Sequence, residues 1–194
     1  VDNTFYSPIY QRPIEDGADI VLHSATKYLA GHNDVLAGVV VTDDADLYEK
    51  LFYNLNTTGA VLSPFDSYQL IRGLKTLSLR MERSTANAQE IVAFLEQSPA
   101  VKEVLYTGRG GMISFKVADE KRIPHILNTL KVFSFAESLG GVESLITYPT
   151  TQTHADIPAE VRHSYGLTDD LLRLSIGIED ARDLIEDLHQ ALEG

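Results

Sequence analysis

The stretch Asp19-Ile20-Val21-Leu22-His23-Ser24-Ala25-Thr26-Lys27-Tyr28 joins a short apolar run to an abrupt polar end. Residues 18–23 follow a glycine and precede polar side chains, and this pattern predicts a buried strand. Lys27 closes the run, and a buried ammonium group is costly and tends to lose its proton. The position therefore indicates an amine with its own chemistry. The alternative is a surface lysine that follows a strand.

Two hydroxyl side chains, Ser24 and Thr26, flank this lysine. A neutral lysine amine is a nucleophile that can form a Schiff base, and hydroxyl donors suit a phosphate group. Residues two apart lie on the same side of an extended chain, so we expect both hydroxyls to face one phosphate. The combination predicts pyridoxal 5'-phosphate (PLP) as the cofactor. The alternative is that both hydroxyls bond backbone groups at the strand end.

The composition is that of an acidic globular protein. The chain has 194 residues, a net charge of −12 and 44% hydrophobic residues. The negative charge and the lack of a Lys/Arg-rich run argue against nucleic acid or an anionic membrane as a partner. No apolar stretch is long enough to span a bilayer, and the absence of cysteine excludes disulfides and thiolate chemistry. We expect a soluble, cytoplasmic protein.

The pattern around this stretch alternates strands and helices. Val39-Val40-Val41 within residues 36–42 predicts a second strand, and residues 46–56 predict a helix. Ser63 followed by Pro64 predicts the start of a long helix that ends near Gln97 and is broken near Gly73 or bridges two modules.

The elements after Pro99 are shorter and predict a small α+β domain. The predicted strands cover residues 101–106, 112–117, 133–136 and 171–176, with a hairpin turn at residues 108–111 between the first two. The predicted helices cover residues 123–130 and an amphipathic segment that Asp180 caps.

Four sequence blocks in order carry a resemblance to a known family. The blocks are Asp2-Asn3-Thr4; Ser24-Ala25-Thr26-Lys27-Tyr28 with Gly31-His32-x-Asp34; Ser138-Leu139-Gly140-Gly141-x-Glu143-Ser144; and Arg173-Leu174-Ser175-Ile176-Gly177-Ile178-Glu179. The series resembles the PLP-dependent transsulfuration enzymes, which include cystathionine γ-synthase, cystathionine γ- and β-lyase, methionine γ-lyase and O-acetylhomoserine sulfhydrylase. The resemblance covers the whole chain but only the C-terminal half of such an enzyme, so we expect the chain to be a piece of a longer protein.

The resemblance implies an α/β fold with three parts. Residues 1–62 would be the end of the large PLP-binding domain of a fold-type I (aspartate aminotransferase-like) enzyme, residues 63–98 a linking helix, and residues 99–194 a small α+β C-terminal domain. The half that precedes them would supply the aromatic side chain that stacks on PLP, backbone amides for the phosphate, and an arginine and a tyrosine across a dimer interface.

The resemblance also implies roles for the cofactor residues. Lys27 would bind PLP covalently and then, once freed, move the α-proton of the substrate. Asp2 would pair with the pyridine nitrogen, where a lasting negative charge keeps the ring an electron sink. Ser24 and Thr26 would bind the phosphate. For Asp2 the alternative is an acid in an Asp-Asn-Thr turn.

The remaining candidate residues belong to the substrate side. Arg173 lies within an apolar run and needs an anion, which a substrate carboxylate would supply; the alternative is an internal salt bridge. By resemblance, Ser138 and Thr153 would help to hold that carboxylate, and Glu137 would suit the distal amino group of cystathionine. The alternatives are loop-capping hydroxyls and an exposed loop acid. The spacing of His23, His32 and Asp34 fits no common metal site, so we expect no metal.

These implications lead to one expected function and one alternative. We expect γ-replacement of an O-acyl-homoserine with cysteine to give cystathionine in methionine biosynthesis, with cystathionine γ- or β-lyase as the competing activity. The family forms homotetramers built as dimers of dimers. As an isolated piece, the chain is expected to be catalytically inactive.

Overall fold

The computed structural model describes all 194 residues and divides them into two units, Val1–Leu79 (unit 1) and Arg80–Gly194 (unit 2). The division falls inside one helix, α4, which spans Leu77–Leu95. No helix combines the length and the apolar character that crossing a bilayer requires.

Unit 1 is built around a two-stranded antiparallel sheet. Strand β1 (Val21–Ser24) pairs with β2 (Gly38–Val41), and Asp2 forms a parallel bridge with Leu22 on the other side of β1. Three helices complete the unit: α1 (Ser7–Tyr10), α2 (Ala45–Thr58) and α3 (Pro64–Leu74). The predicted strand is thus confirmed, although it begins three residues later than predicted and is not buried throughout, since Leu22 is exposed.

Helix α3 fixes the turn that follows β1. A Cβ added to Gly73 would lie 2.3 Å from the carbonyl oxygen of Ala30, so only glycine permits this close approach. Tyr28, Leu29 and Ala30 are all buried there. The packing of α3 therefore holds the segment directly after Lys27.

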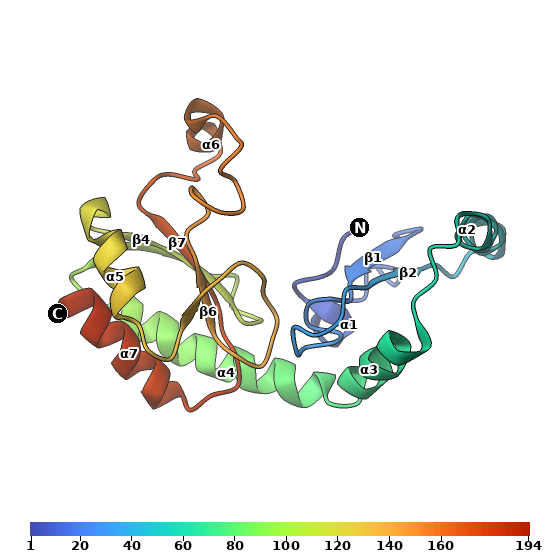
Figure 1. Ribbon diagram of the computed structural model, residues 1–194, viewed down its shortest axis with the longest axis horizontal. Helices are drawn as coiled ribbons and strands as arrows, with labels where there is room; N and C mark the ends of the chain where they lie inside the picture. The colour runs from blue at the N-terminus through green and yellow to red at the C-terminus, as the bar shows by residue number, and fades with distance from the viewer. The chain divides into compact units, whose positions relative to one another are not determined.

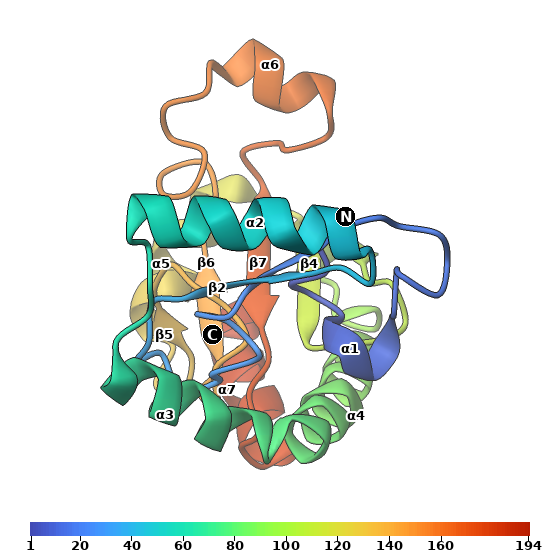
Figure 2. The same cartoon turned by 90° about the vertical axis from the view of Figure 1, so that its right-hand side faces the viewer.

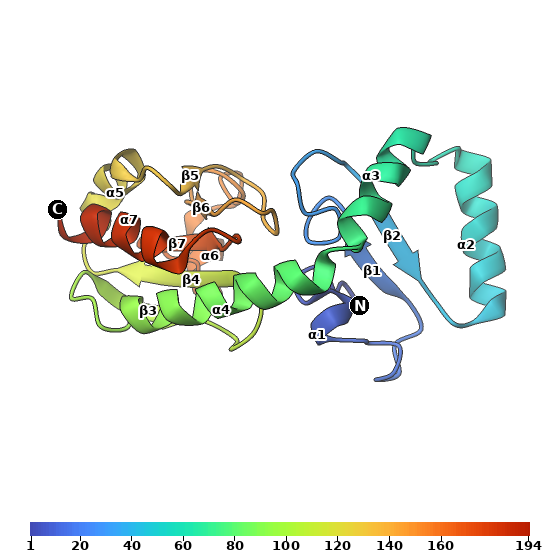
Figure 3. The same cartoon turned by 90° about the horizontal axis from the view of Figure 1, so that it is seen from below.

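Helix α2 forms as predicted but buries none of its residues. Tyr48 and Phe52 stack on each other with ring centroids 6.0 Å apart, and both are more than half exposed. Figures 1 and 3 show α2 standing away from β1 and β2. Unit 1 therefore presents apolar surface that it does not cover itself.

Unit 2 contains a five-stranded sheet in the order β3-β4-β7-β6-β5. Its strands are β3 (Val101–Leu105), β4 (Met112–Val117), β5 (Ser134–Phe135), β6 (Leu145–Thr147) and β7 (Leu171–Ser175). All neighbours are antiparallel except β5 and β6. The central strand, β7, carries Arg173.

The core of unit 2 lies between one face of this sheet and its helices, α4, α5 (Ile123–Thr129) and α7 (Ala181–Glu193). Figure 1 shows α4 and α7 side by side against that face. Leu172 and Leu174 of β7 pack into the core with Leu184 and Leu188 of α7. Because side chains alternate along a strand, Arg173 and Ser175 face the opposite side of the sheet.

The structure confirms the expected small α+β architecture and corrects two details. The long predicted helix is interrupted at residues 75–76, close to the expected break near Gly73. Four short elements escaped prediction: the three-residue strand β6, helix α6 (Ala159–Ser164), helix α1 and a 3-10 helix, η1 (Glu120–Arg122). In Figures 1 and 2, α6 stands in a long loop on the side of the sheet away from α4 and α7.

Candidate cofactor and substrate sites

Lys27 lies in the turn after β1, three residues beyond the end of the strand. Its amide donates to the carbonyl of Ser24 at 3.1 Å, and its carbonyl accepts from the amide of Gly31 at 2.8 Å. The side chain is partly buried. Strand ends of this kind are where open α/β sheets bind ligands, because side chains and backbone groups converge there.

Asp2 reaches the same end of β1 through a neighbouring extended segment. Its Oδ1 accepts from the amide of Thr4 at 2.9 Å, and the hydroxyl of Thr4 accepts from the amide of Ser24 at 2.8 Å. Hydrogen bonds from the Thr4 hydroxyl and amide lower the pKa of Asp2 below its ordinary value. The carboxylate is therefore anionic at neutral pH, as a partner of a protonated pyridine nitrogen must be.

Thr26 departs from the geometry predicted for it. Strand β1 ends at Ser24, so the alternation that would align Ser24 with Thr26 does not continue to the second hydroxyl. The Thr26 hydroxyl accepts from the amide of Ala37 at 3.0 Å and donates to its carbonyl at 3.3 Å. This hydroxyl already bonds backbone groups. To donate to a phosphate, it would have to give up its hydrogen bond to the Ala37 carbonyl.

The residue types at this strand end fit PLP. The segment places an amine, a hydroxyl and a lasting anion on adjoining backbone segments, namely Lys27, Ser24 and Asp2. These are the groups required to bind the aldehyde, the phosphate and the pyridine nitrogen. Thr4, which links the last two, escaped prediction although it belongs to the Asp2-Asn3-Thr4 block.

Arg173 is the candidate substrate residue with the clearest structural signature. Its guanidinium donates to the carbonyl of Ser138 and to the hydroxyl of Thr147, both at 3.3 Å. Its Nε is buried without a hydrogen-bond partner, and no carboxylate lies within salt-bridge distance. Burial lowers the pKa of Arg173, and the charge of Glu137 opposes that shift. The internal salt bridge considered as the alternative is therefore absent.

The loop of residues 136–144 (the 136–144 loop) joins β5 to β6 and covers the outer face of β7. Its Gly140 amide donates to the hydroxyl of Ser175 at 2.8 Å. At its end, the buried Ser144 hydroxyl donates to Glu179 and accepts from the Gly177 amide, both at 2.9 Å. Sequence reasoning did not identify Ser175 or Glu179 as the residues that hold this loop.

Within this loop, Ser138 has a φ of +114°, a value that is strained for a residue other than glycine. Such strain costs about 1–3 kcal/mol and clusters at ligand sites. Glu137 beside it is exposed but near enough to influence Arg173. The structure thus brings Glu137, Ser138 and Arg173 together.

The hydroxyl of Thr153 has its hydrogen-bond partner outside that group. This residue occupies the loop between β6 and α6, is exposed, and has its hydroxyl 2.8 Å from Nδ1 of His154. Its role at the substrate carboxylate stays a prediction.

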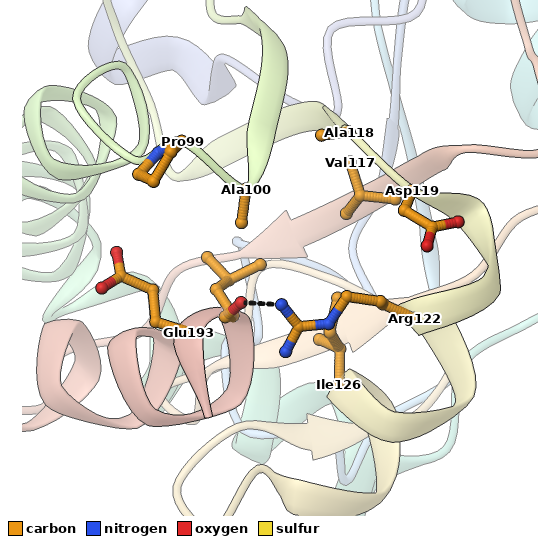
Figure 4. A pocket seen from close by; sticks show the side chains of 9 residues that line it. Pro99, Ala100, Val117, Ala118, Asp119, Arg122, Ile126 and Glu193 are labelled. Atoms are coloured by element: carbon orange, nitrogen blue, oxygen red, sulfur yellow. Dashed lines mark hydrogen bonds between the residues drawn. The ribbon is translucent and has the colours of Figure 1, made fainter.

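Two pockets are lined by other residues than these candidates. In unit 2, an open pocket of about 380 Å³ is lined by Ala100, Val117 and Ile126, with Arg122 donating to the Leu192 carbonyl at 2.7 Å (Figure 4). That cation caps the end of α7, so its role is structural. In unit 1, an apolar pocket of about 400 Å³ includes His23, whose pKa burial lowers.

The fold and the donor set define a class, the fold-type I PLP enzymes. The chain belongs to the Cys/Met metabolism PLP-dependent enzyme family, whose model matches residues 1–193. The family is PLP-dependent, so PLP is the cofactor.

Known relatives divide between two types of reaction. The cystathionine gamma-synthase/O-acetylhomoserine (thiol)-lyase of Bacillus subtilis is 61% identical over 192 residues, which cover 99% of this chain and 52% of that protein. The cystathionine gamma-lyase of Bacillus subtilis is 53% identical over 209 residues, covering 100% of this chain and 55% of that protein. Other relatives are cystathionine beta-lyases. The chain thus spans about half the length of the curated relatives it matches.

A solved structure supports the fold. The cystathionine gamma synthase from Xanthomonas oryzae pv. oryzae, in complex with aminoacrylate and cysteine, matches with a TM-score of 0.95 and 44% identity. The match covers 99% of this chain and 54% of that chain.

Proposed function

We propose that the full-length enzyme carrying these residues performs γ-replacement, joining an O-acyl-homoserine to cysteine to give cystathionine. The observation that carries this choice is the way the relatives align. The match to the Bacillus subtilis synthase runs over 192 residues and needs no added length. The match to the γ-lyase runs over 209 positions, 15 more than the 194 residues of this chain. The alignment with the γ-lyase therefore requires gaps in this chain, whereas the alignment with the synthase does not.

The chemistry divides among PLP and three residues, Lys27, Asp2 and Arg173. Bound PLP would supply the electron sink that makes the substrate α-proton acidic. Lys27 acts as the base that takes this proton and moves a proton at Cβ, so that the Cγ–O bond can break with release of the acyloxy group as a carboxylate and the cysteine thiol can add at Cγ. Asp2 keeps the pyridine nitrogen charged, and Arg173 binds the substrate carboxylate in two-point fashion.

Glu137 and Ser138 complete the substrate side in this proposal. Glu137 is an exposed acid close to Arg173, which suits the second amino group of cystathionine. Ser138 adds a polar contact to the carboxylate, and Thr153 contributes from the loop after β6. Ser24 and Thr26 contact the phosphate.

Cystathionine cleavage is the second candidate, because 53% identity to a γ-lyase extends over the whole chain and the same residues serve elimination. The deciding experiment supplies full-length enzyme with O-acetyl- or O-succinyl-homoserine and cysteine, and in parallel with cystathionine alone. We expect cystathionine to form in the first reaction. Cleavage of cystathionine without any synthesis would exclude the synthase function.

Assembly and location are further parts of the proposal. A homotetramer organised as a dimer of dimers would share its active sites between subunits, and light scattering of the full-length enzyme measures that mass. We place the enzyme in the cytoplasm, where methionine is made.

A further inference from the structure

Thr147 is a buried hydroxyl residue directly beside Arg173, the proposed ligand of the substrate carboxylate. It lies on β6 and is the cross-strand partner of Arg173 on β7. The residue is 1% exposed, so water cannot replace its hydrogen-bond partners in the protein. Neither the sequence blocks nor the proposed reaction gives it a role.

The two hydrogen bonds of Thr147 fix the direction of its hydroxyl. A hydroxyl has one hydrogen to donate, and that of Thr147 goes to the carbonyl of Ala136 at 2.9 Å. An oxygen lone pair consequently remains for the guanidinium of Arg173, whose N–H lies 3.3 Å away. The backbone carbonyl of Ser138 accepts from the same guanidinium nitrogen.

These contacts join the arginine to the 136–144 loop at two points. Ala136 and Ser138 flank Glu137, and each is tied to Arg173, the first through Thr147 and the second directly. No carboxylate lies within salt-bridge distance of Arg173, so its hydrogen bonds in this structure go to neutral oxygens, and these orient the guanidinium. A guanidinium held in one orientation binds a carboxylate with less loss of freedom.

We propose that Thr147 is a positioning residue that orients Arg173 for the substrate carboxylate and couples it to the loop carrying Glu137 and Ser138. The inference rests on the proposed function of Arg173 as the carboxylate clamp. Thr147 touches neither substrate nor cofactor in this role, so it acts on substrate affinity through Arg173.

The test uses full-length enzyme with Thr147→Val, which keeps the shape and removes the hydroxyl, and Thr147→Ser, which restores it. Thr147→Ala is a second deletion that leaves room for water if valine is poorly accommodated. We expect the KM for O-acetyl-homoserine to rise about tenfold in the Val variant. We expect kcat to stay within about twofold, and the Ser variant to restore most of the affinity.

Two further measurements separate this inference from its basis. Arg173→Lys should raise the same KM, because an ammonium cannot form the two-point contact; an unchanged KM there would refute the proposed clamp itself. The visible absorbance of lysine-bound PLP should be unchanged in all Thr147 variants. If Arg173→Lys raises the KM but Thr147→Val and Thr147→Ala both bind substrate normally, Thr147 has no positioning role. Loss of the PLP band in the two Thr147 variants would refute that role as well.

Discussion

Thr4 connects two of the cofactor residues although its own side chain carries no reactive group. Its hydroxyl accepts from the Ser24 amide across 20 residues of sequence, and its amide donates to Asp2. The same hydroxyl is the largest cause of the lowered pKa of Asp2. Thr4 therefore holds Asp2 and Ser24, the proposed partners of the pyridine nitrogen and the phosphate, in a fixed relation.

Replacing Thr4 by valine should weaken PLP binding. The change leaves the Ser24 amide without its acceptor, and a net hydrogen bond is worth about 1 kcal/mol, which corresponds to an approximately fivefold rise in the apparent Kd for PLP. Titration of the cofactor-free full-length enzyme with PLP, followed by visible absorbance, measures this Kd. Thr4→Ser is the matched control and should bind PLP like the unchanged enzyme. Equal affinity in the Val variant would contradict the role.

Single residues also mark the limit of what the sequence predicts about the site. Lys27 and Arg173 are recognisable because an ionisable group inside an apolar run needs a partner. Thr4, Thr147 and Ser175 are ordinary hydroxyl residues whose partners lie 20, 26 and 35 positions away. Only the folded backbone reveals those contacts.

Helix α7 illustrates how one element positions another. Asp187, buried on this helix, accepts from the amides of Lys131, Val132 and Phe133 at 2.8–3.0 Å. These residues lead directly into β5 and the 136–144 loop. Helix α7 thus anchors the segment that leads into β5 and the 136–144 loop, in addition to packing in the core.

Asp187→Ala should destabilise unit 2 by about 3 kcal/mol, because it removes the charged acceptor of three backbone amides, that of the buried Phe133 among them. Denaturant unfolding followed by circular dichroism measures the change. Glu186→Ala on the exposed side of the same helix is the control and should shift stability by less than about 0.5 kcal/mol. Similar effects of the two substitutions would show that the amide contacts do not stabilise the protein.

The start of α7 gives stability a dependence on pH. The Asp180 side chain accepts from the Arg182 amide and side chain, which lowers its pKa to about 2. Since this folded-state pKa lies below the unfolded value of 3.8, the stabilisation is full above about pH 4 and is lost as the pH falls through about 2. The difference in Tm between the unchanged protein and Asp180→Ala should therefore shrink between pH 5 and pH 2.5. A constant difference would contradict the assigned pKa.

Elements with a clear local signal were predictable even when short, such as β5, whereas β6 was not. Helix α2, the cap of α7 and the hairpin between β3 and β4 follow from local sequence. Strand β6 has only three residues, and its pairing with β7 comes from the sheet rather than from its own pattern. The break before α4 is predicted near Gly73, but the close approach of Gly73 to the Ala30 carbonyl is visible only in the folded backbone.

At the scale of the whole molecule, the two units differ in how well they bury their apolar residues. Most of the exposed large hydrophobic side chains belong to unit 1, although it is the smaller unit. Leu22 and Val40 face each other across β1 and β2 and are 45% and 49% exposed. A two-stranded sheet has little stability of its own in water, and unit 2 has the continuous core.

This difference predicts the behaviour of the 194-residue chain when it is prepared alone. We expect unit 2 to melt cooperatively, while the uncovered surface of unit 1 binds a hydrophobic dye and promotes self-association. Because the cofactor residues lie in unit 1, we also expect no measurable turnover and no strong visible PLP band. Full-length enzyme is the positive control, and Lys27→Ala within it should abolish the band. The opposite result would be a monodisperse 194-residue chain that turns over substrate and has a strong PLP band, which its own Lys27→Ala variant loses. That result would show that these residues alone make a working site.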